Sequence, residues 1–181
     1  MGRERIDYND FNQKLRYSMG ERQKFDCEVL RNHLPLCIDV KKTDVETDKT
    51  GIDYIATLRG GSEIYIDAKT REQGCSRYWK NGEPELAIET WSVVEKKITG
   101  WTYKDNTQVD YILYTFPENG CREYFFIPFQ LLRKVSIENY REWSRDYPKK
   151  KQRNRTYHSE AIFVPADVVI AAIEKAMRGV S

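Results

Sequence analysis

The spacing of apolar residues changes at Pro35. Before this proline, the residues of one mostly apolar stripe recur every three or four positions: Tyr8, Phe11, Leu15, Met19, Arg22, Phe25 and Val29. That spacing places side chains on one face of an α-helix. Proline has no backbone N–H and cannot continue a helix. We therefore predict N-terminal helices over residues 7–34, with Gly20 as the point where they can divide.

Two β-rich runs follow, one on each side of a glycine pair. Residues 52–58 (IDYIATL) and 63–71 (EIYIDAKTR) are rich in β-branched and aromatic side chains, and Gly60-Gly61 lies between them. Such runs around a glycine turn are typical of a β-hairpin. A further strand is expected just before the hairpin, at residues 36–40.

The second half of the chain alternates strand-like and helix-like segments. Strands are expected at residues 85–94, 108–116, 123–127 and 160–164. The last two each run into a proline, and proline suits the first turn of a helix, so helices are expected over residues 128–135 and 165–178. The basic stretch between these two units, residues 147–158, is expected to be an exposed loop.

Together these segments predict an α/β (α+β) protein with a central mixed β-sheet flanked by helices. The length of 181 residues favours a single domain. Within residues 1–181 we expect the N-terminal helices first, then the core sheet over residues 36–116, then two strand–helix units over residues 123–178.

Composition narrows the class of protein. Lys and Arg total 30 against 28 Asp and Glu, so the net charge is only +2. No apolar run approaches the ~18–20 residues of a membrane span, and the N-terminus has no apolar signal segment. The four cysteines form no CxxC pair, which favours reduced thiols over a zinc site or a disulfide framework. We therefore expect a soluble protein in the cytoplasm with no membrane partner.

Candidate chemistry is concentrated in the predicted hairpin, where Asp53, Asp67 and Lys69 form the pattern D-x13-D-x-K. Side chains two positions apart on a strand share a face, so Asp67 and Lys69 point to one side. An aspartate beside them on the partner strand completes a group of two carboxylates and one ammonium. Mg²⁺ prefers oxygen ligands of this kind, completed by water and substrate phosphate. A lysine there can orient or deprotonate an attacking water.

This group requires a particular hairpin register. A strict two-residue loop, Gly60-Gly61, would turn Asp53 to the opposite face from Asp67. A three-residue loop, Gly60–Ser62, would place Asp53 opposite Lys69 and on the same face as Asp67. The site therefore predicts an odd-numbered loop or a bulge in this hairpin.

The runs G-I-D-Y-I-A and I-Y-I-D-A-K-T-R, at residues 51–56 and 64–71, resemble the motif of the PD-(D/E)XK nuclease superfamily. The similarity is to its Holliday-junction-resolvase-like and small phage or restriction-type branches, although Ile52 stands in place of the motif's proline. The resemblance covers roughly residues 20–135. It implies a restriction-endonuclease-like core, Mg²⁺ or Mn²⁺ as cofactor, and hydrolysis of phosphodiester bonds in DNA.

The resemblance also implies roles for individual residues. Asp53 and Asp67 would hold the metal, and Lys69 would position the water. Glu28, on the predicted helix, would be a further metal ligand, and Glu89, on a following strand, a further catalytic acid. A homodimer is one arrangement that would bring a site to each strand of a duplex.

Basic residues near this group and in the basic stretch are candidates for contacts with DNA phosphates. They are Arg71, Arg77, Lys80, Lys149, Lys150, Lys151, Arg153 and Arg155. Acids gather at residues 44–53 and bases at 149–155, so the near-zero net charge does not exclude DNA as a partner.

Simpler explanations stay open for each feature. Asp67 and Lys69 can belong to an ordinary strand face with an ion pair, Glu21 competes with Glu28 on the helix, and Glu89 can be a polar position of an alternating strand. The basic stretch can be a solvated loop. The chain can also be a catalytically silent nuclease-fold module that binds nucleic acid or a protein partner, or a nuclease directed at RNA. Convergence of the hairpin side chains favours catalysis, and divergence favours the module.

Overall fold

The computed structural model describes residues 23–44, 51–71, 75–79, 82–105, 107–118, 121–154 and 156–179. The predicted helices over residues 7–22 lie outside this part. A helix over residues 23–33 lies within it and ends before Pro35, as the sequence predicts.

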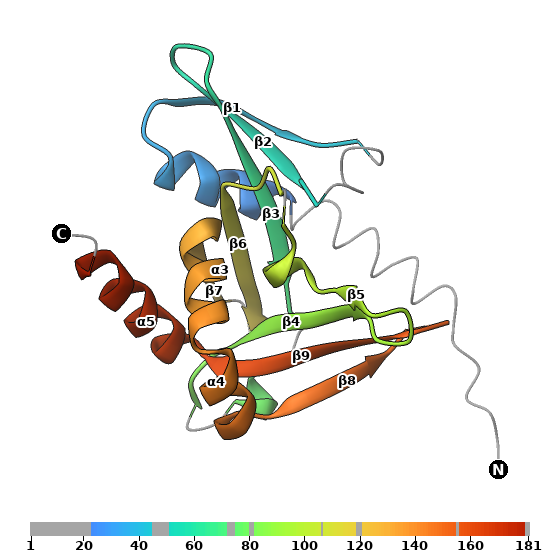
Figure 1. The fold of residues 1–181 in the computed structure, drawn as a ribbon. Coiled ribbons are helices and arrows are strands. Elements are labelled where there is room, and N and C mark those ends of the chain that lie inside the picture. The colour runs from blue at the N-terminus through green and yellow to red at the C-terminus, as the bar shows by residue number, and fades with distance from the viewer. Residues whose placement is uncertain are drawn as a thin grey trace.

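A mixed five-stranded β-sheet forms the centre of the fold (Figure 1). Its strands, in spatial order, are β1 (Cys37–Lys42), β2 (Tyr54–Leu58), β3 (Glu63–Thr70), β6 (Tyr111–Glu118) and β7 (Cys121–Pro128). Neighbouring strands are antiparallel except β3 and β6, which are parallel. The prediction of a central mixed sheet flanked by helices is confirmed.

A second, antiparallel sheet of four strands runs across the lower end of the first one in Figure 1. Its strands, in spatial order, are β5 (Ile98–Thr99), β4 (Glu85–Val93), β9 (His158–Pro165) and β8 (Lys149–Arg153). The strand predicted at residues 85–94 is therefore present as β4, but outside the core sheet. It pairs with β9, which is distant in sequence, rather than with the hairpin that precedes it.

The basic stretch is exposed, as predicted, but the predicted loop is wrong, because this stretch contains strand β8. All five residues of Lys149–Arg153 pair with β9. Lysine is depleted in strands, so pairing with β9 rather than local preference determines this element. Because side chains alternate along a strand, Lys150 and Gln152 point to one side of β8. Lys149, Lys151 and Arg153 point to the opposite side.

Two strand–proline–helix units follow in the predicted order. α3 (Phe129–Glu138) and α5 (Ala166–Arg178) each begin directly after the proline that ends a strand. A further helix that the sequence analysis did not predict, α4 (Tyr140–Asp146), follows α3 and contributes the buried Trp143. Short 3-10 helices lie at Cys75–Tyr78 and Trp101–Tyr103.

Apolar side chains on the two faces of the five-stranded sheet form two cores. On one face, Tyr54, Ile66 and Ala68 pack in a cluster with residues of the helix over 23–33. The other face belongs to a larger cluster that includes the second sheet, α3 and α5. Side chains alternate along β3, so Asp67, which lies between Ile66 and Ala68, points away from the N-terminal helix.

The connection between the parallel strands β3 and β6 carries β4, β5 and the two 3-10 helices, and its described part contains no α-helix. Such a crossover usually holds an α-helix, so the restriction-endonuclease-like core stays a prediction. Within the described ranges, no helix has both the length and the apolar character needed to cross a bilayer.

Candidate functional site

The register of the β2–β3 hairpin brings Asp53 beside Asp67. The strands pair from Tyr54 opposite Ile66 to Thr57 opposite Glu63. Asp53 lies just before the paired residues, and its backbone N–H donates to the Ile66 carbonyl at 2.9 Å. Its Oδ2 accepts a hydrogen bond from the Ala68 backbone N–H at 2.7 Å, and its carboxyl contacts that of Asp67, so the two aspartates lie together, as the sequence predicts.

The loop of this hairpin has an odd number of residues, as the site required. The backbone N–H of Leu58 donates to the carbonyl of Ser62 at 2.8 Å, which leaves the three-residue loop Arg59–Gly61. Gly60 and Gly61 have φ values of 109° and 87°, a conformation that favours glycine. The loop begins one residue earlier than expected, and Asp53 lies beside Asp67 rather than opposite Lys69.

Asp67 is a buried carboxylate held by a lysine of its own strand. It is 4% exposed, and the Lys69 Nζ lies 2.7 Å from its Oδ1. The lysine side chain retains 31% exposure. Lys69 therefore contacts the buried Asp67 carboxylate and remains accessible from the surface.

Asp53 is partly buried, and its environment disfavours the charged form. Burial raises the pKa of its carboxyl above the ordinary value, and a contact with the Asp67 carboxyl raises it further. The backbone N–H of Ala68, which donates to Asp53 Oδ2 at 2.7 Å, and the nearby Lys69 charge act in the opposite direction on this pKa. Two adjacent carboxylates with a single ammonium are an arrangement that a divalent cation would stabilise.

The chain offers an internal comparison, because β1 carries a second D-x-K sequence. There the Lys41 Nζ lies 3.5 Å from Asp39 Oδ2, and the side chains are 77% and 45% exposed, respectively. This pair is a solvated surface ion pair of the kind that contributes little. Local spacing is thus the same in both sequences, and burial beside a second carboxylate distinguishes Asp67 and Lys69.

Glu28 is exposed on the helix over residues 23–33. That helix packs on the sheet face opposite to the aspartate pair. The buried acid of the helix is Asp26, which accepts a hydrogen bond from the Tyr54 hydroxyl at 2.8 Å. The structure does not bring Glu28 to the pair, and its role as a metal ligand stays a prediction.

The two aspartates would have to hold a metal ion without a third acidic or imidazole ligand from the described residues. No group of three or more His, Cys, Asp or Glu in this part of the chain is arranged to hold a metal ion. Mg²⁺ is often held by one or two carboxylates, with water and substrate phosphate in the other positions. The residues present fit such a site.

Glu89, on β4, organises the turn that follows its strand. Its Oε2 accepts hydrogen bonds from the Ser92 hydroxyl at 2.7 Å and from the Trp101 backbone N–H at 3.0 Å. Gly100 approaches the Glu89 backbone so closely that a Cβ there would overlap with it. These contacts hold the Trp101 ring beneath Lys69, whose Nζ lies 5.3 Å from the ring centre. The position of Glu89 is therefore structural, and its proposed catalytic role stays a prediction.

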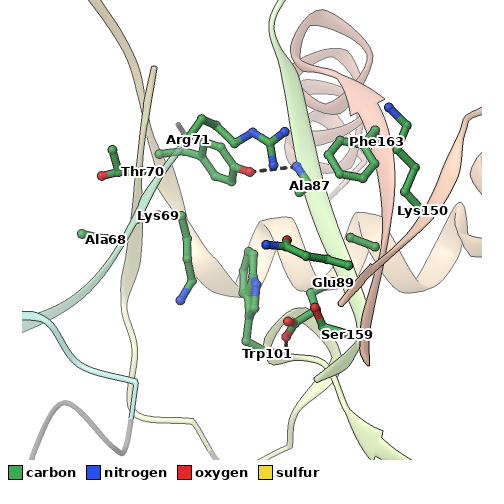
Figure 2. Close-up of a pocket in the computed structure, with 13 residues that line it drawn as sticks. Ala68, Lys69, Thr70, Arg71, Ala87, Glu89, Trp101, Lys150, Ser159 and Phe163 are labelled. Atoms are coloured by element: carbon green, nitrogen blue, oxygen red, sulfur yellow. Dashed lines mark hydrogen bonds between the residues drawn. The ribbon is translucent and has the colours of Figure 1, made fainter. Parts of the chain in front are cut away.

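A cavity of about 340 Å³ lies between the two sheets, beside Lys69. In Figure 2, Lys69 and Arg71 reach into it from the first sheet, whereas Glu89, Phe163 and Lys150 come from the second. It thus brings together Lys69, Arg71, Glu89 and Lys150, which the sequence analysis named separately.

The other basic candidates that the structure describes do not line this cavity. Lys149 pairs with Glu160 at 3.2 Å, and Lys151 and Arg153 are exposed on the opposite side of β8. Arg77 is exposed on the first 3-10 helix. Lys80 and Arg155 lie outside the described residues.

The lining residues that the sequence analysis missed include Tyr114, Gln152 and Phe163. The Tyr114 hydroxyl accepts a hydrogen bond from the Ala87 backbone N–H at 3.0 Å and so connects the two sheets. Each is an ordinary strand residue in sequence. Only the pairing of β3 with β6 and of β9 with β8 could have identified them.

No family model, curated protein or solved structure matches this chain. The site must therefore be interpreted from its own geometry.

Proposed function

We propose that this protein is a divalent-metal-dependent endonuclease that hydrolyses phosphodiester bonds in DNA, with Mg²⁺ or Mn²⁺ as cofactor. One observation carries the proposal: Asp53 and Asp67 share a face and contact each other, and the Lys69 ammonium binds the buried member of the pair at 2.7 Å. Convergence of these side chains is what a catalytic D-x13-D-x-K group requires. The cytoplasmic location and the homodimer expected from the sequence belong to the same proposal.

Each residue of the group has a role that its position supports. The Asp53 and Asp67 carboxylates would hold the metal, which when bound supplies a water of lowered pKa and positive charge for the phosphorane oxygens. Lys69 contacts Asp67 and also lines the cavity. Its ammonium can therefore orient the attacking water or stabilise negative charge on the phosphate.

The alternative, a silent module with this fold, requires the same side chains to diverge or to be blocked. The contact between the aspartates argues against divergence.

The proposal is tested by incubating the purified protein with supercoiled, linear and branched DNA and with RNA, in Mg²⁺ or Mn²⁺. We expect DNA cleavage that EDTA abolishes. Asp67→Asn should lower the rate by about 10²–10³-fold, the loss typical when one electrostatic contribution to the transition state is removed, because the variant lacks a ligand of the metal. Asp39→Asn is the matched control, because it neutralises the exposed D-x-K sequence of β1.

Equal rates for the two asparagine variants would contradict the assignment of the site. Absence of both cleavage and divalent-ion binding in the wild-type protein would refute the proposed function. Faster cleavage of RNA than of DNA would change the substrate class but keep the assigned residues.

A further inference from the structure

We propose that the cavity between the two sheets binds one unpaired DNA strand, so that the substrate class is single-stranded DNA, including the unpaired segments of branched molecules. This inference rests on the proposed nuclease function and adds a preference among its substrates. The cavity is next to the aspartate pair through Lys69, which lines it and also contacts Asp67.

The dimensions of the cavity admit one strand. Its volume of about 340 Å³ is within the range of small-ligand sites, about 300–1,000 Å³. A sphere of that volume is about 9 Å across, whereas the major groove of a DNA duplex alone is about 12 Å wide. The space between the sheets therefore has the size of a single nucleotide unit rather than of two paired strands.

The charge of the lining favours a polyanion. Three cations, Lys69, Arg71 and Lys150, line the cavity with one carboxylate, Glu89. The Glu89 Oε2 already accepts two hydrogen bonds from the protein. The Lys69 ammonium also pairs with Asp67 at 2.7 Å, so the phosphates of a nucleic acid backbone would find positive charge mainly at Arg71 and Lys150.

Aromatic rings hold these cations in place. The Lys69 Nζ lies 5.3 Å from the Trp101 ring centre, and the Arg71 Cζ and Lys150 Nζ lie 4.9 and 5.0 Å from that of Phe163. Cation–π contacts restrict long side chains before a ligand arrives, which lowers the entropic cost of binding. A cationic channel with aromatic side chains is the arrangement that binds single strands with little dependence on sequence.

Strand β8 supplies a matched comparison. Lys150 points into the cavity, and Lys151, one position along, points to the other side of the strand. Removing either lysine changes the net charge of the protein by the same amount. A difference between the two variants therefore reports on the cavity rather than on overall charge.

The test is fluorescence anisotropy with a labelled oligothymidylate and with a duplex of the same length, in EDTA so that no cleavage occurs. We expect the single strand to bind more tightly than the duplex. Each phosphate neutralised on a single strand contributes about 0.7 to the slope of log affinity against log salt. Arg71→Ala and Lys150→Ala should each reduce the slope by about this amount, and Arg71→Lys should restore most of it.

The outcomes separate this inference from the proposed function. If Lys150→Ala and Lys151→Ala weaken single-strand binding equally, or if the duplex binds as tightly as the single strand, the inference is overturned, although cleavage could still be observed. If the predicted slopes are found but no metal supports cleavage of any DNA, the strand-binding cavity is supported and the nuclease proposal fails. Circular dichroism and melting curves confirm that each variant is folded.

Discussion

Replacing Lys69 with alanine is expected to destabilise the protein, because it leaves the buried Asp67 carboxylate without its cation. The two groups are 2.7 Å apart, and their side chains are 31% and 6% exposed. A hydrogen bond to a charged group contributes about 1.5–3 kcal/mol, so we expect the free energy of unfolding to fall by about that amount. For a chain of this size, this corresponds to a melting temperature lower by roughly 3–12 °C.

Lys41→Ala is the control, since it breaks the same local D-x-K sequence on β1. That pair is 3.5 Å apart and well exposed, and exposed pairs contribute about 0.2–1 kcal/mol. Urea denaturation of both variants and the wild type measures the difference as a shift in midpoint at an unchanged slope. Equal midpoints for the two variants would refute the reasoning that burial gives the Lys69 pair its importance.

Mg²⁺ provides a second readout on the same variants. Without the ammonium, the carboxylates of Asp53 and Asp67 should accept a divalent ion more readily, so the ion should restore part of the lost stability of Lys69→Ala. An ion present at 100 times its dissociation constant stabilises the folded state by about 2.7 kcal/mol. If Mg²⁺ stabilises Lys41→Ala as much as Lys69→Ala, the stabilisation does not come from the aspartate pair.

Two further predictions concern the same region. Asp53→Asn should abolish cleavage but raise the melting temperature at neutral pH. Burial and the Asp67 carboxyl raise the pKa of Asp53, so ionisation of Asp53 destabilises the folded state above that raised pKa, and asparagine does not ionise. The difference in melting temperature between the variant and the wild type should shrink as the pH falls from the raised pKa of Asp53 towards the ordinary pKa of an aspartate. A difference that grows on acidification would contradict a raised pKa. Gly100→Ala should cost about 1–3 kcal/mol in urea denaturation and slow cleavage, because a Cβ there overlaps with the Glu89 backbone and displaces the turn. Gly179→Ala, which meets no atom closer than 3.6 Å, should change neither measurement.

Local sequence patterns predicted many of the elements. The hairpin and the helices after Pro128 and Pro165 were all found within a few residues of their expected positions. Their signals are short-range: β-branched runs, a glycine loop, and a proline that ends one element and begins another. The odd-numbered hairpin loop was also predicted from local sequence, and the loop Arg59–Gly61 has three residues.

Elements that depend on distant partners were predicted less well. Strand β8 has the composition of a solvated loop. It is a strand because the backbone of Lys149–Arg153 pairs with that of β9. The second sheet was missed for the same reason, since β4 finds its partner β9 about seventy residues along the chain. Pairing between such segments depends on the whole packed structure rather than on the composition of either strand.

The sequence by itself determined that Asp67 and Lys69 share one side of a strand, because side chains alternate with a period of two. The same rule gives Asp39 and Lys41 an identical local arrangement, and nothing local distinguishes the two pairs. Only the tertiary structure buries Asp67, brings Asp53 against it and places Lys150 around the same cavity as Lys69 and Arg71. The physical reason is that burial and charge proximity are properties of contacts between strands, and these contacts join residues that are far apart in the chain.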